Sequence, residues 1–389
     1  MTVTVRSFAK INLGLRIGAA REDGFHELLT VYQTIGLHDV IRVGVERGRG
    51  IEIRCADPRV PTDESNTCFR IVEKATQAMG AKGRVVVEIE KRLPVQGGMG
   101  GASSNAVATL LGLERALKKS LSAAEKLRIA AEVGSDLPLF LVGGTVLGMG
   151  RGERVFPLED LASVTCVVVT PEVGVSTPRA FAEWDRVWGE GGQEPVELRS
   201  TGQPGAAVPT RTFSTSAVST QAGAAGLRSA WPDQRSGPTQ ATPMASKPGP
   251  TRTKSTPSEA AKLTVAEGSD RMNLLGCGLS AWLSEPYSGA PFGRGRAENH
   301  ILELVRAGIE NDFERVVFPE YPELSDGKRA LLSAGAKYAS LSGSGSTLYG
   351  LFASREAAVR ATARLRKQGW AAQTTATLTR PSYWRRIWV

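Results

Sequence analysis

The chain has 389 residues, of which 41% are hydrophobic and 22% charged, and its formal net charge is +9. This length exceeds what one hydrophobic core usually organises, so we expect two folded domains. No apolar run approaches the roughly 20 residues that cross a bilayer, which excludes a membrane-spanning protein. The first residues do not resemble a secretory signal, and the four cysteines form no C-x-x-C pair, so we expect a cytoplasmic protein without a zinc site.

Part of the positive charge lies in a tract of low complexity. Between residues 200 and 260, six basic residues stand against two acidic ones, and small or polar residues dominate without helical or strand periodicity. Such a tract has little apolar area to offset the entropy lost on ordering. We therefore expect a disordered insertion at 189–269, and the rest of the chain is only mildly basic.

The N-terminal half begins with apolar residues on odd positions from Val3 to Ile17, which predicts a strand with Lys10 and Asn12 together on a polar face. Helices are predicted from Ser65-Asn66 to about 79, from 103–105 to about 118, and after Ser122, where Glu125 completes a capping box. Runs of β-branched residues predict further strands at 31–35, 40–45, 85–89, 145–147 and 166–169.

The C-terminal half shows the same mixture of patterns. We predict helices near 298–309, 322–334 and 354–367, strands near 338–341 and 346–352, and a final strand after them. Both halves therefore have an α/β character of the α+β type. We expect one domain at 1–160 and a second at 161–389, interrupted by the insertion.

The most informative stretch is the segment 91–105, which reads KRLPVQGGMGGASSN. It predicts a strand end, a glycine-rich turn and the start of an apolar helix. Glycines allow positive φ and close backbone approach, while free N–H groups and the helix dipole attract an anion, so a polyphosphate fits this place. A Walker Gly-Lys-Ser/Thr and the G-x-G-x-x-G spacing are both absent. From the glycines alone, a flexible turn before a capped helix is an equal alternative.

The neighbours of these glycines extend the pattern. The run from Pro94 to Ser104 resembles the phosphate loop of the GHMP kinase superfamily, which includes galactose, homoserine and mevalonate kinases. Ala9–Leu13 is similar to the first motif of that superfamily, and Leu341–Ser346 to its third. This resemblance implies a two-domain GHMP kinase fold, with an N-terminal domain like ribosomal protein S5 domain 2 and a ferredoxin-like C-terminal domain.

Three further segments, 21–27, 91–94 and 134–140, resemble one branch of the superfamily. That branch phosphorylates the 2-hydroxyl of 4-diphosphocytidyl-2-C-methyl-D-erythritol in the non-mevalonate isoprenoid precursor pathway. The resemblance implies ATP and Mg²⁺ as cofactors and a small-molecule substrate as the partner, with no membrane or nucleic-acid partner, and it leaves a homodimer open.

The resemblance implies that Lys10 and Asp136 face the acceptor hydroxyl. An alcohol is a poor nucleophile, so a carboxylate within reach would accept its proton while an ammonium orients that carboxylate. Taken singly, Asp136 would be a turn residue before Pro138 and Lys10 a solvent-facing strand lysine. Asn12, beside Lys10 on the same face, is assigned to the substrate.

Binding residues follow from the same resemblance. Phe25 and His26 would hold the cytosine ring, against the alternative of a hydrophobic plug and a surface histidine. Gln96 and Ala102 replace glycines that are usual in the loop, at a cost of about 1 kcal/mol where positive φ is required. Ser342, Gly343 and Gly345 offer further donors near the phosphates. The residues assigned to ATP are Asn66, Pro94, Val95, Gln96, Gly97, Gly98, Met99, Gly100, Gly101, Ala102, Ser103 and Ser104.

Two alternatives remain. The first keeps the fold and changes the acceptor to mevalonate, homoserine or a sugar. The second is a nucleic-acid-binding protein that grips phosphates through the basic tract and the tail at 384–386. It leaves the three glycine and lysine motifs unexplained.

Overall fold

The computed structural model describes residues 2–188 and 310–389. These residues belong to one compact unit, which spans Met1–Glu194 and Val265–Val389. The predicted insertion at 189–269 and the predicted helix at 298–309 lie outside the described residues. Within the described ranges, no helix combines the length and the apolar character that crossing a bilayer requires.

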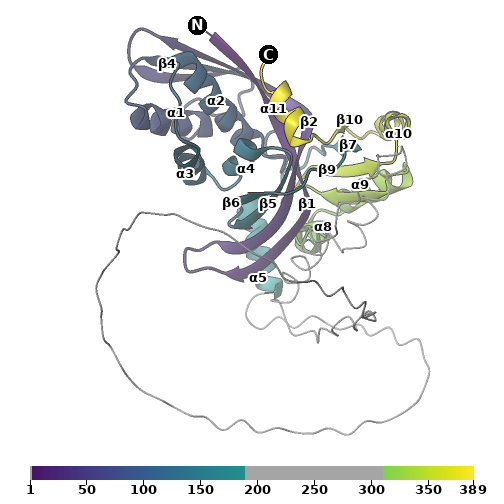
Figure 1. The fold of residues 1–389 in the computed structure, drawn as a ribbon. Coiled ribbons are helices and arrows are strands. Elements are labelled where there is room, and N and C mark those ends of the chain that lie inside the picture. The colour runs from purple at the N-terminus through teal and green to yellow at the C-terminus, as the bar shows by residue number, and fades with distance from the viewer. Residues whose placement is uncertain (1, 189–309) are drawn as a thin grey trace, which may run out of the picture. The chain divides into compact units, whose positions relative to one another are not determined.

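The N-terminal half forms a six-stranded sheet in the order β3-β4-β2-β5-β6, with β1 paired to β2 (Figure 1). The β3–β4 pair is parallel and the other pairs are antiparallel. The predicted strands at 31–35 and 40–45 are parts of one long strand, β2. The strands are β1 (Thr2–Ala20), β2 (His26–Glu46), β3 (Gly50–Cys55), β4 (Arg84–Glu90), β5 (Thr145–Gly150) and β6 (Arg154–Pro157).

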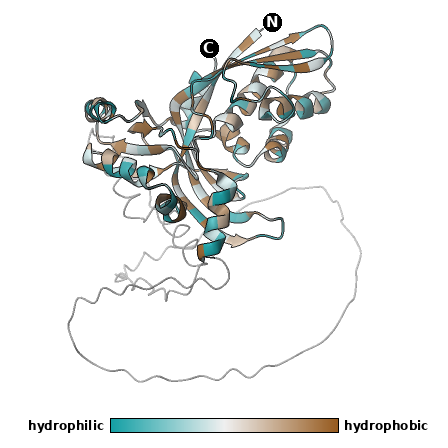
Figure 2. Ribbon diagram, turned by 180° about the vertical axis from the view of Figure 1, so that it is seen from behind, coloured by the Kyte–Doolittle hydropathy of each residue, from teal (hydrophilic) through white to brown (hydrophobic). Residues whose placement is uncertain are grey.

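Helices α1 (Thr67–Ala78), α2 (Gly101–Leu117), α3 (Ala123–Val133) and α4 (Leu137–Val142) pack with this sheet around one hydrophobic core. Figure 2 shows hydrophobic residues gathered on the strands and on the helix faces turned toward them. Two predicted N-caps are confirmed: Asn66 accepts a hydrogen bond from the backbone N–H of Cys68, and Ser122 one from that of Glu125. Local side-chain to backbone bonds therefore set these helix starts.

The start predicted for α2 at 103–105 is wrong by two to four residues. The helix begins at Gly101, after an N-cap at Gly100 with φ of 68°. Ser104 and Asn105 are buried inside the helix and hold side-chain partners across the core. Their capping propensity is overridden because the glycine turn itself supplies the change of chain direction.

The C-terminal half forms a four-stranded antiparallel sheet in the order β10-β7-β9-β8. The predicted strand at 338–341 and the final strand are confirmed, and the strand predicted from 346 begins two residues later. The strands are β7 (Thr165–Val169), β8 (Tyr338–Leu341), β9 (Leu348–Phe352) and β10 (Ala372–Ala376). The helices are α5 (Thr177–Trp188), α8 (Glu314–Glu320), α9 (Pro322–Ser333) and α10 (Arg355–Lys367).

The last helix, α11 (Arg380–Arg386), returns to the first core. The hydroxyl of Tyr383 donates to the carbonyl of Phe140 at 2.8 Å, and the indole of Trp384 donates to the carbonyl of Val142 at 3.0 Å. These bonds satisfy carbonyls of α4 that the end of a helix leaves free. The tail that was considered above as a nucleic-acid-binding segment therefore packs against α4 and stabilises its C-terminal end. The predicted domain boundary between residues 160 and 161 stays a prediction.

Candidate active site

Three segments that are far apart in the chain meet at Lys10. The backbone N–H of Lys10 donates to the carbonyl of Met99 at 3.0 Å, which joins β1 to the glycine loop. The hydroxyl of Ser342 donates to the carbonyl of Gly98 at 3.1 Å, and the N–H of Thr347 to that of Gly97 at 3.2 Å. The turn between β8 and β9 is therefore fastened to the same loop.

Backbone conformation and close backbone approach explain two of the glycines here. Gly98 has a φ of +73°, and a Cβ atom there would collide with the carbonyl oxygen of Ser342. Gly343 has a φ of +60°, and a Cβ atom would lie 3.4 Å from Lys10 Nζ. Glycine is therefore required at Gly98 by both conformation and space, whereas at Gly343 it is favoured by the positive φ alone.

The structure brings together the two residues assigned to the reaction. Lys10 Nζ lies 3.5 Å from Asp136 Oδ2, with the lysine side chain 4% exposed and the aspartate 32% exposed. Lys10 Nζ also donates to Asn12 Oδ1 at 2.6 Å. Burial lowers the pKa of Lys10, and the charge of Asp136 opposes that effect. The pair thus holds a confined positive charge beside a carboxylate that solvent or a substrate can reach.

Tyr32, on β2, completes this pair, and sequence analysis missed it. Its hydroxyl donates to Asp136 Oδ1 at 3.0 Å, and its ring centroid lies 5.5 Å from Lys10 Nζ. Burial raises the pKa of Tyr32 well above 10.0, with a further contribution from the charge of Asp136. The phenol therefore stays a donor, and each carboxylate oxygen has its own partner. An aromatic residue on a predicted strand gave no signal for this contact.

Asn12 is held on every side. Its Nδ2 donates to Thr30 Oγ1 at 2.8 Å, and its carbonyl accepts from the hydroxyl of Tyr349 at 2.8 Å. Because Tyr349 belongs to β9, this bond ties the second sheet directly to the strand that carries Lys10. Asn12 therefore orients the ammonium, and its amide is already engaged within the protein.

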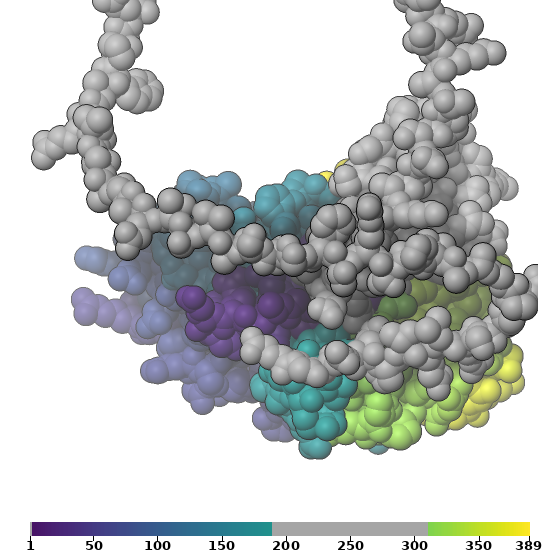
Figure 3. All heavy atoms as spheres, turned by 90° about the horizontal axis from the view of Figure 1, so that it is seen from below, coloured from purple at the N-terminus to yellow at the C-terminus, as the bar shows by residue number. Residues whose placement is uncertain are grey.

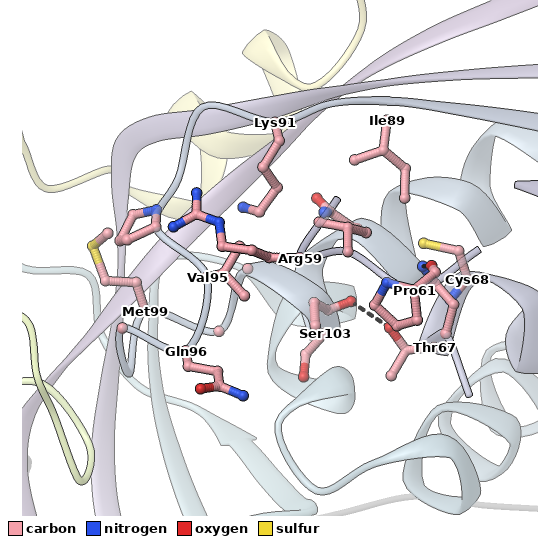
Figure 4. Close-up of a pocket in the computed structure, with 18 of the residues that line it drawn as sticks. Arg59, Pro61, Thr67, Cys68, Ile89, Lys91, Val95, Gln96, Met99 and Ser103 are labelled. Atoms are coloured by element: carbon pink, nitrogen blue, oxygen red, sulfur yellow. Dashed lines mark hydrogen bonds between the residues drawn. The ribbon is translucent and has the colours of Figure 1, made fainter. Parts of the chain in front are cut away.

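A cavity of about 290 Å³ lies beside the glycine loop (Figure 4). Arg59 and Pro61 come from the segment before α1, and Thr67 donates to the carbonyl of Ala102 across the cavity rim. Every residue assigned to ATP lines this cavity except Ser104. The hydroxyl of Ser104 is buried against Ser7 Oγ at 2.6 Å. Ser104 therefore does not face the cavity but joins the first turn of α2 to β1 through Ser7.

Gln96 and Ala102, which replace glycines usual in the family's loop, differ in backbone conformation. Gln96 has a φ of 59°, in the left-handed region. Ala102 lies in the first turn of α2, where an ordinary residue fits. The loop therefore bears strain of about 1 kcal/mol at Gln96 only.

Asn66 lines the cavity, but its amide serves the start of α1. Its Oδ1 accepts from the N–H of Cys68 at 2.8 Å, and its Nδ2 donates to the carbonyl of Pro61 at 2.5 Å. It fixes the chain that borders the cavity. Its predicted contact with the nucleotide stays a prediction.

Asp39 is a second residue that sequence analysis missed. It is fully buried on β2, and its Oδ1 accepts from the backbone N–H groups of Arg92 and Leu93, both at 2.7 Å. Its Oδ2 accepts from Lys91 Nζ at 2.7 Å and from Asn105 Nδ2 at 3.0 Å. One carboxylate therefore holds the entry of the glycine loop and the helix that leaves it.

Phe25 and His26 lie at the hairpin between β1 and β2 and differ in exposure. Phe25 is 48% exposed, which leaves ring surface for a ligand. His26 is buried: its Nε2 lies 3.0 Å from Asp185 Oδ1, and its ring stacks on Phe181 at 5.1 Å with an interplanar angle of 4°. Figure 3 shows α5, in teal, next to the purple N-terminal strands. The exposed platform is therefore Phe25, while His26 joins the hairpin to α5.

No group of three or more His, Cys, Asp or Glu side chains that could hold a metal ion occurs in the described part of the chain. Magnesium prefers oxygen ligands and commonly takes most of them from phosphates and water. Ser103 offers a hydroxyl oxygen at the cavity. A hydroxyl at this place fits a cation that arrives with a nucleotide and takes its other ligands from phosphate and water.

Comparison with protein families gives two matches. The GHMP kinases N terminal domain matches residues 66–144, and the GHMP kinases C terminal domain matches 295–370. Among solved structures, a 4-(cytidine 5'-diphospho)-2C-methyl-D-erythritol kinase has a TM-score of 0.59 at 24% identity, covering 96% of this chain and 98% of that one. A homoserine kinase from Cytophaga hutchinsonii has a TM-score of 0.60 at 17% identity, covering 97% and 95%. The predicted two-domain GHMP kinase fold is confirmed.

Relatives are also found by sequence. A 4-diphosphocytidyl-2-C-methyl-D-erythritol kinase from Solibacter usitatus is 31% identical over 357 residues, which is 92% of this chain and 83% of the relative. The enzyme of the same name from Rhodococcus jostii is 41% identical over 190 residues, which is 49% of this chain. That match spans only 61% of the Rhodococcus protein. The higher identity is thus confined to about half of the chain.

Proposed function

The chain belongs to the family of 4-diphosphocytidyl-2-C-methyl-D-erythritol kinases, within the GHMP kinases, and from this premise we propose that it transfers the γ-phosphoryl group of ATP to the 2-hydroxyl of that cytidylated alcohol. The observation that carries the proposal is the pair of Lys10 and Asp136 at 3.5 Å, set against the glycine loop. A phosphoryl acceptor needs a base and a phosphate cradle at one place.

Asp136 takes the proton of the acceptor hydroxyl as the new bond to phosphorus forms. Lys10 holds one carboxylate oxygen and Tyr32 the other, so the base is presented in one orientation. The lysine charge also stabilises negative charge that develops on the transferred group. Positioning and electrostatic stabilisation are the main protein contributions to phosphoryl transfer.

The nucleotide occupies the cavity beside the loop. The N–H groups of the glycine turn and the N-terminus of α2 face the phosphates, where the helix dipole favours negative charge. Mg²⁺, when bound with ATP, would neutralise part of the phosphate charge, and Ser103 is one of the hydroxyl residues that line this cavity. Lys91, fixed by Asp39, adds a positive charge at the cavity wall.

The cytosine ring stacks on the exposed face of Phe25. His26 belongs to the same site through its bond to Asp185 and its stacking on Phe181, which set the position of the hairpin. This aromatic platform is the feature that favours the cytidylated alcohol over mevalonate, homoserine or a sugar. We further propose a cytoplasmic location, with the free thiols of Cys55, Cys68 and Cys166 in support.

A substrate panel tests the proposal. The chain is incubated with Mg-ATP and either the cytidylated methylerythritol, mevalonate, homoserine or galactose, and ADP release is measured. We expect turnover with the cytidylated alcohol alone, and phosphorus NMR should place the new phosphate on the 2-oxygen. Turnover of another panel member in its place would refute the substrate assignment.

A further inference from the structure

The turn between β5 and β6 lies between the two ends of the proposed substrate site. The guanidinium carbon of Arg151 is 4.8 Å from the ring centroid of Phe25. At the other end of the turn, a Cβ atom at Gly152 would lie 3.8 Å from Asp136 Oδ1. Resting on the proposed function, the substrate has its cytosine at Phe25 and its reacting hydroxyl at Asp136. Its diphosphate must therefore pass this turn.

The guanidinium of Arg151 has donors to spare. Among the described residues its one ion contact is Glu153 Oε2, at 3.9 Å, which is beyond hydrogen-bond distance. Arg21, the other arginine of this hairpin region, is engaged: it donates to Glu27 at 2.7 Å and to both oxygens of Asp23. Unlike Arg21, Arg151 can therefore bind a new anion without breaking an existing hydrogen bond.

Two neighbouring carboxylates hold the turn and do not occupy the guanidinium. Glu153 Oε2 accepts from the backbone N–H of Arg151 at 2.6 Å, and Glu27 Oε1 accepts from that of Gly150 at 3.1 Å. They fix the backbone from which Arg151 projects. They also surround the turn with negative charge, so a diphosphate would be repelled here without a cation aimed at it.

We propose that Arg151 binds the diphosphate of the cytidylated substrate and so selects a nucleoside diphosphate derivative over a free alcohol. The planar guanidinium suits this task because it offers paired N–H donors to phosphate oxygens. The guanidinium lies over the Phe25 ring, which places the charge next to the proposed site of the cytosine. The charge thus acts on the acceptor and not on ATP.

The test compares Arg151→Gln with Arg154→Gln, which removes the same charge from the exposed neighbouring strand β6. Loss of charge-assisted hydrogen bonds should raise KM for the cytidylated alcohol roughly tenfold to hundredfold. We expect kcat and KM for ATP to stay within about twofold of wild type, and Arg154→Gln to change none of the three. Arg151→Lys should recover part of the loss because it restores charge without the fork.

Inhibition by fragments separates the diphosphate from the base. CDP should inhibit Arg151→Gln much more weakly than wild type, whereas cytidine, which has no phosphate, should inhibit both equally. Equal weakening of both inhibitors would show that Arg151 only supports the Phe25 ring and would overturn the inference. An unchanged KM in Arg151→Gln, with wild type turning over the substrate, would also overturn it. A wild-type protein inactive on this substrate would instead refute the proposed function.

Discussion

Replacing Asp39 by asparagine should remove hydrogen bonds that hold the entry of the glycine loop and should lower the stability of the protein. The side chain is fully buried and receives four hydrogen bonds, from the N–H groups of Arg92 and Leu93, from Lys91 and from Asn105. Asparagine keeps one oxygen for the two backbone donors. Its amide group then faces Lys91 and Asn105, which are donors themselves, so two bonds are lost and the lysine charge is left unpaired.

The expected cost is large because the ion pair is buried, with the Lys91 side chain 9% exposed. Removing one partner of a buried pair costs about 3–5 kcal/mol. At roughly 1–2 °C per kcal/mol for a folded unit of more than 250 residues, the melting temperature should fall by roughly 3–10 °C. Lys91 also lines the cavity, so the affinity for ATP should fall with it.

The assay is a melting curve and calorimetric ATP binding on four proteins: wild type, Asp39→Asn, the double variant Asp39→Asn/Lys91→Met, and Glu90→Gln. The double variant should regain much of the stability because no unpaired charge stays buried. Glu90 is a control, since it pairs with Arg42 and Arg92 in half-exposed bridges, and its loss should cost at most about 1 kcal/mol per bridge. An Asp39→Asn protein as stable as Glu90→Gln would refute the reasoning.

Two further predictions concern the reacting pair. Tyr32→Phe removes only the donor to Asp136 and should lower kcat by about tenfold with KM for ATP unchanged; a kcat equal to that of wild type would exclude an orienting role. Since burial lowers the pKa of Lys10 below 10.5, kcat should fall on the alkaline side at a lower pH than an ordinary lysine would give, and Lys10→Arg should shift that limb upward. Between the lowered pKa of Lys10 in the folded protein and the ordinary value of 10.5, the unfolded chain keeps the ammonium proton that the folded protein has lost. The free energy of unfolding should therefore rise with pH in this range. A pH profile of kcat beside urea unfolding at each pH checks both signs.

Much of the secondary structure could be predicted from local sequence patterns. Asn66 and Ser122 cap their helices through bonds to residues two and three positions away, and such bonds can be deduced from neighbouring letters. The helix α4 was missed because a six-residue apolar run with Pro138 near its start has no periodicity to detect. Its end is held by Tyr383 and Trp384, more than 240 positions away. No local pattern encodes that support.

The period-two pattern of β1 predicted the side of the strand but not its burial. Ala9, Ile11 and Leu13 pack in one core with Cys166 and other residues of the second sheet. The opposite face, which a half-exposed strand would turn to water, carries Lys10 and Asn12 and is buried as well. Polar residues are tolerated there because each has a hydrogen-bonding or ionic partner.

The parts of the site that are formed by contiguous motifs were predicted from the sequence. The parts that are formed by single residues far apart in the chain were missed. The glycine loop and the Lys10–Asn12 face are runs of adjacent or alternating letters. Tyr32 meets Asp136 from 104 positions away, and Asp39 meets Lys91 from 52 positions away. A tyrosine or an aspartate on a strand has no composition signal that marks such a contact. The structure alone reveals these supporting residues.

The central claim is that Asp136 is the base of a phosphoryl transfer, and Asp136→Asn tests it most directly. The substitution is nearly isosteric, so the calorimetric affinity for ATP should stay close to wild type. The melting temperature should fall, because the buried ammonium of Lys10 loses its carboxylate partner. A single-turnover measurement with the cytidylated methylerythritol should show a rate lower by roughly 10²–10⁴, the range expected for a positioned base. A rate within about threefold of wild type, on folded protein that binds ATP as wild type does, would contradict the account and leave Asp136 only the role of shaping the start of α4.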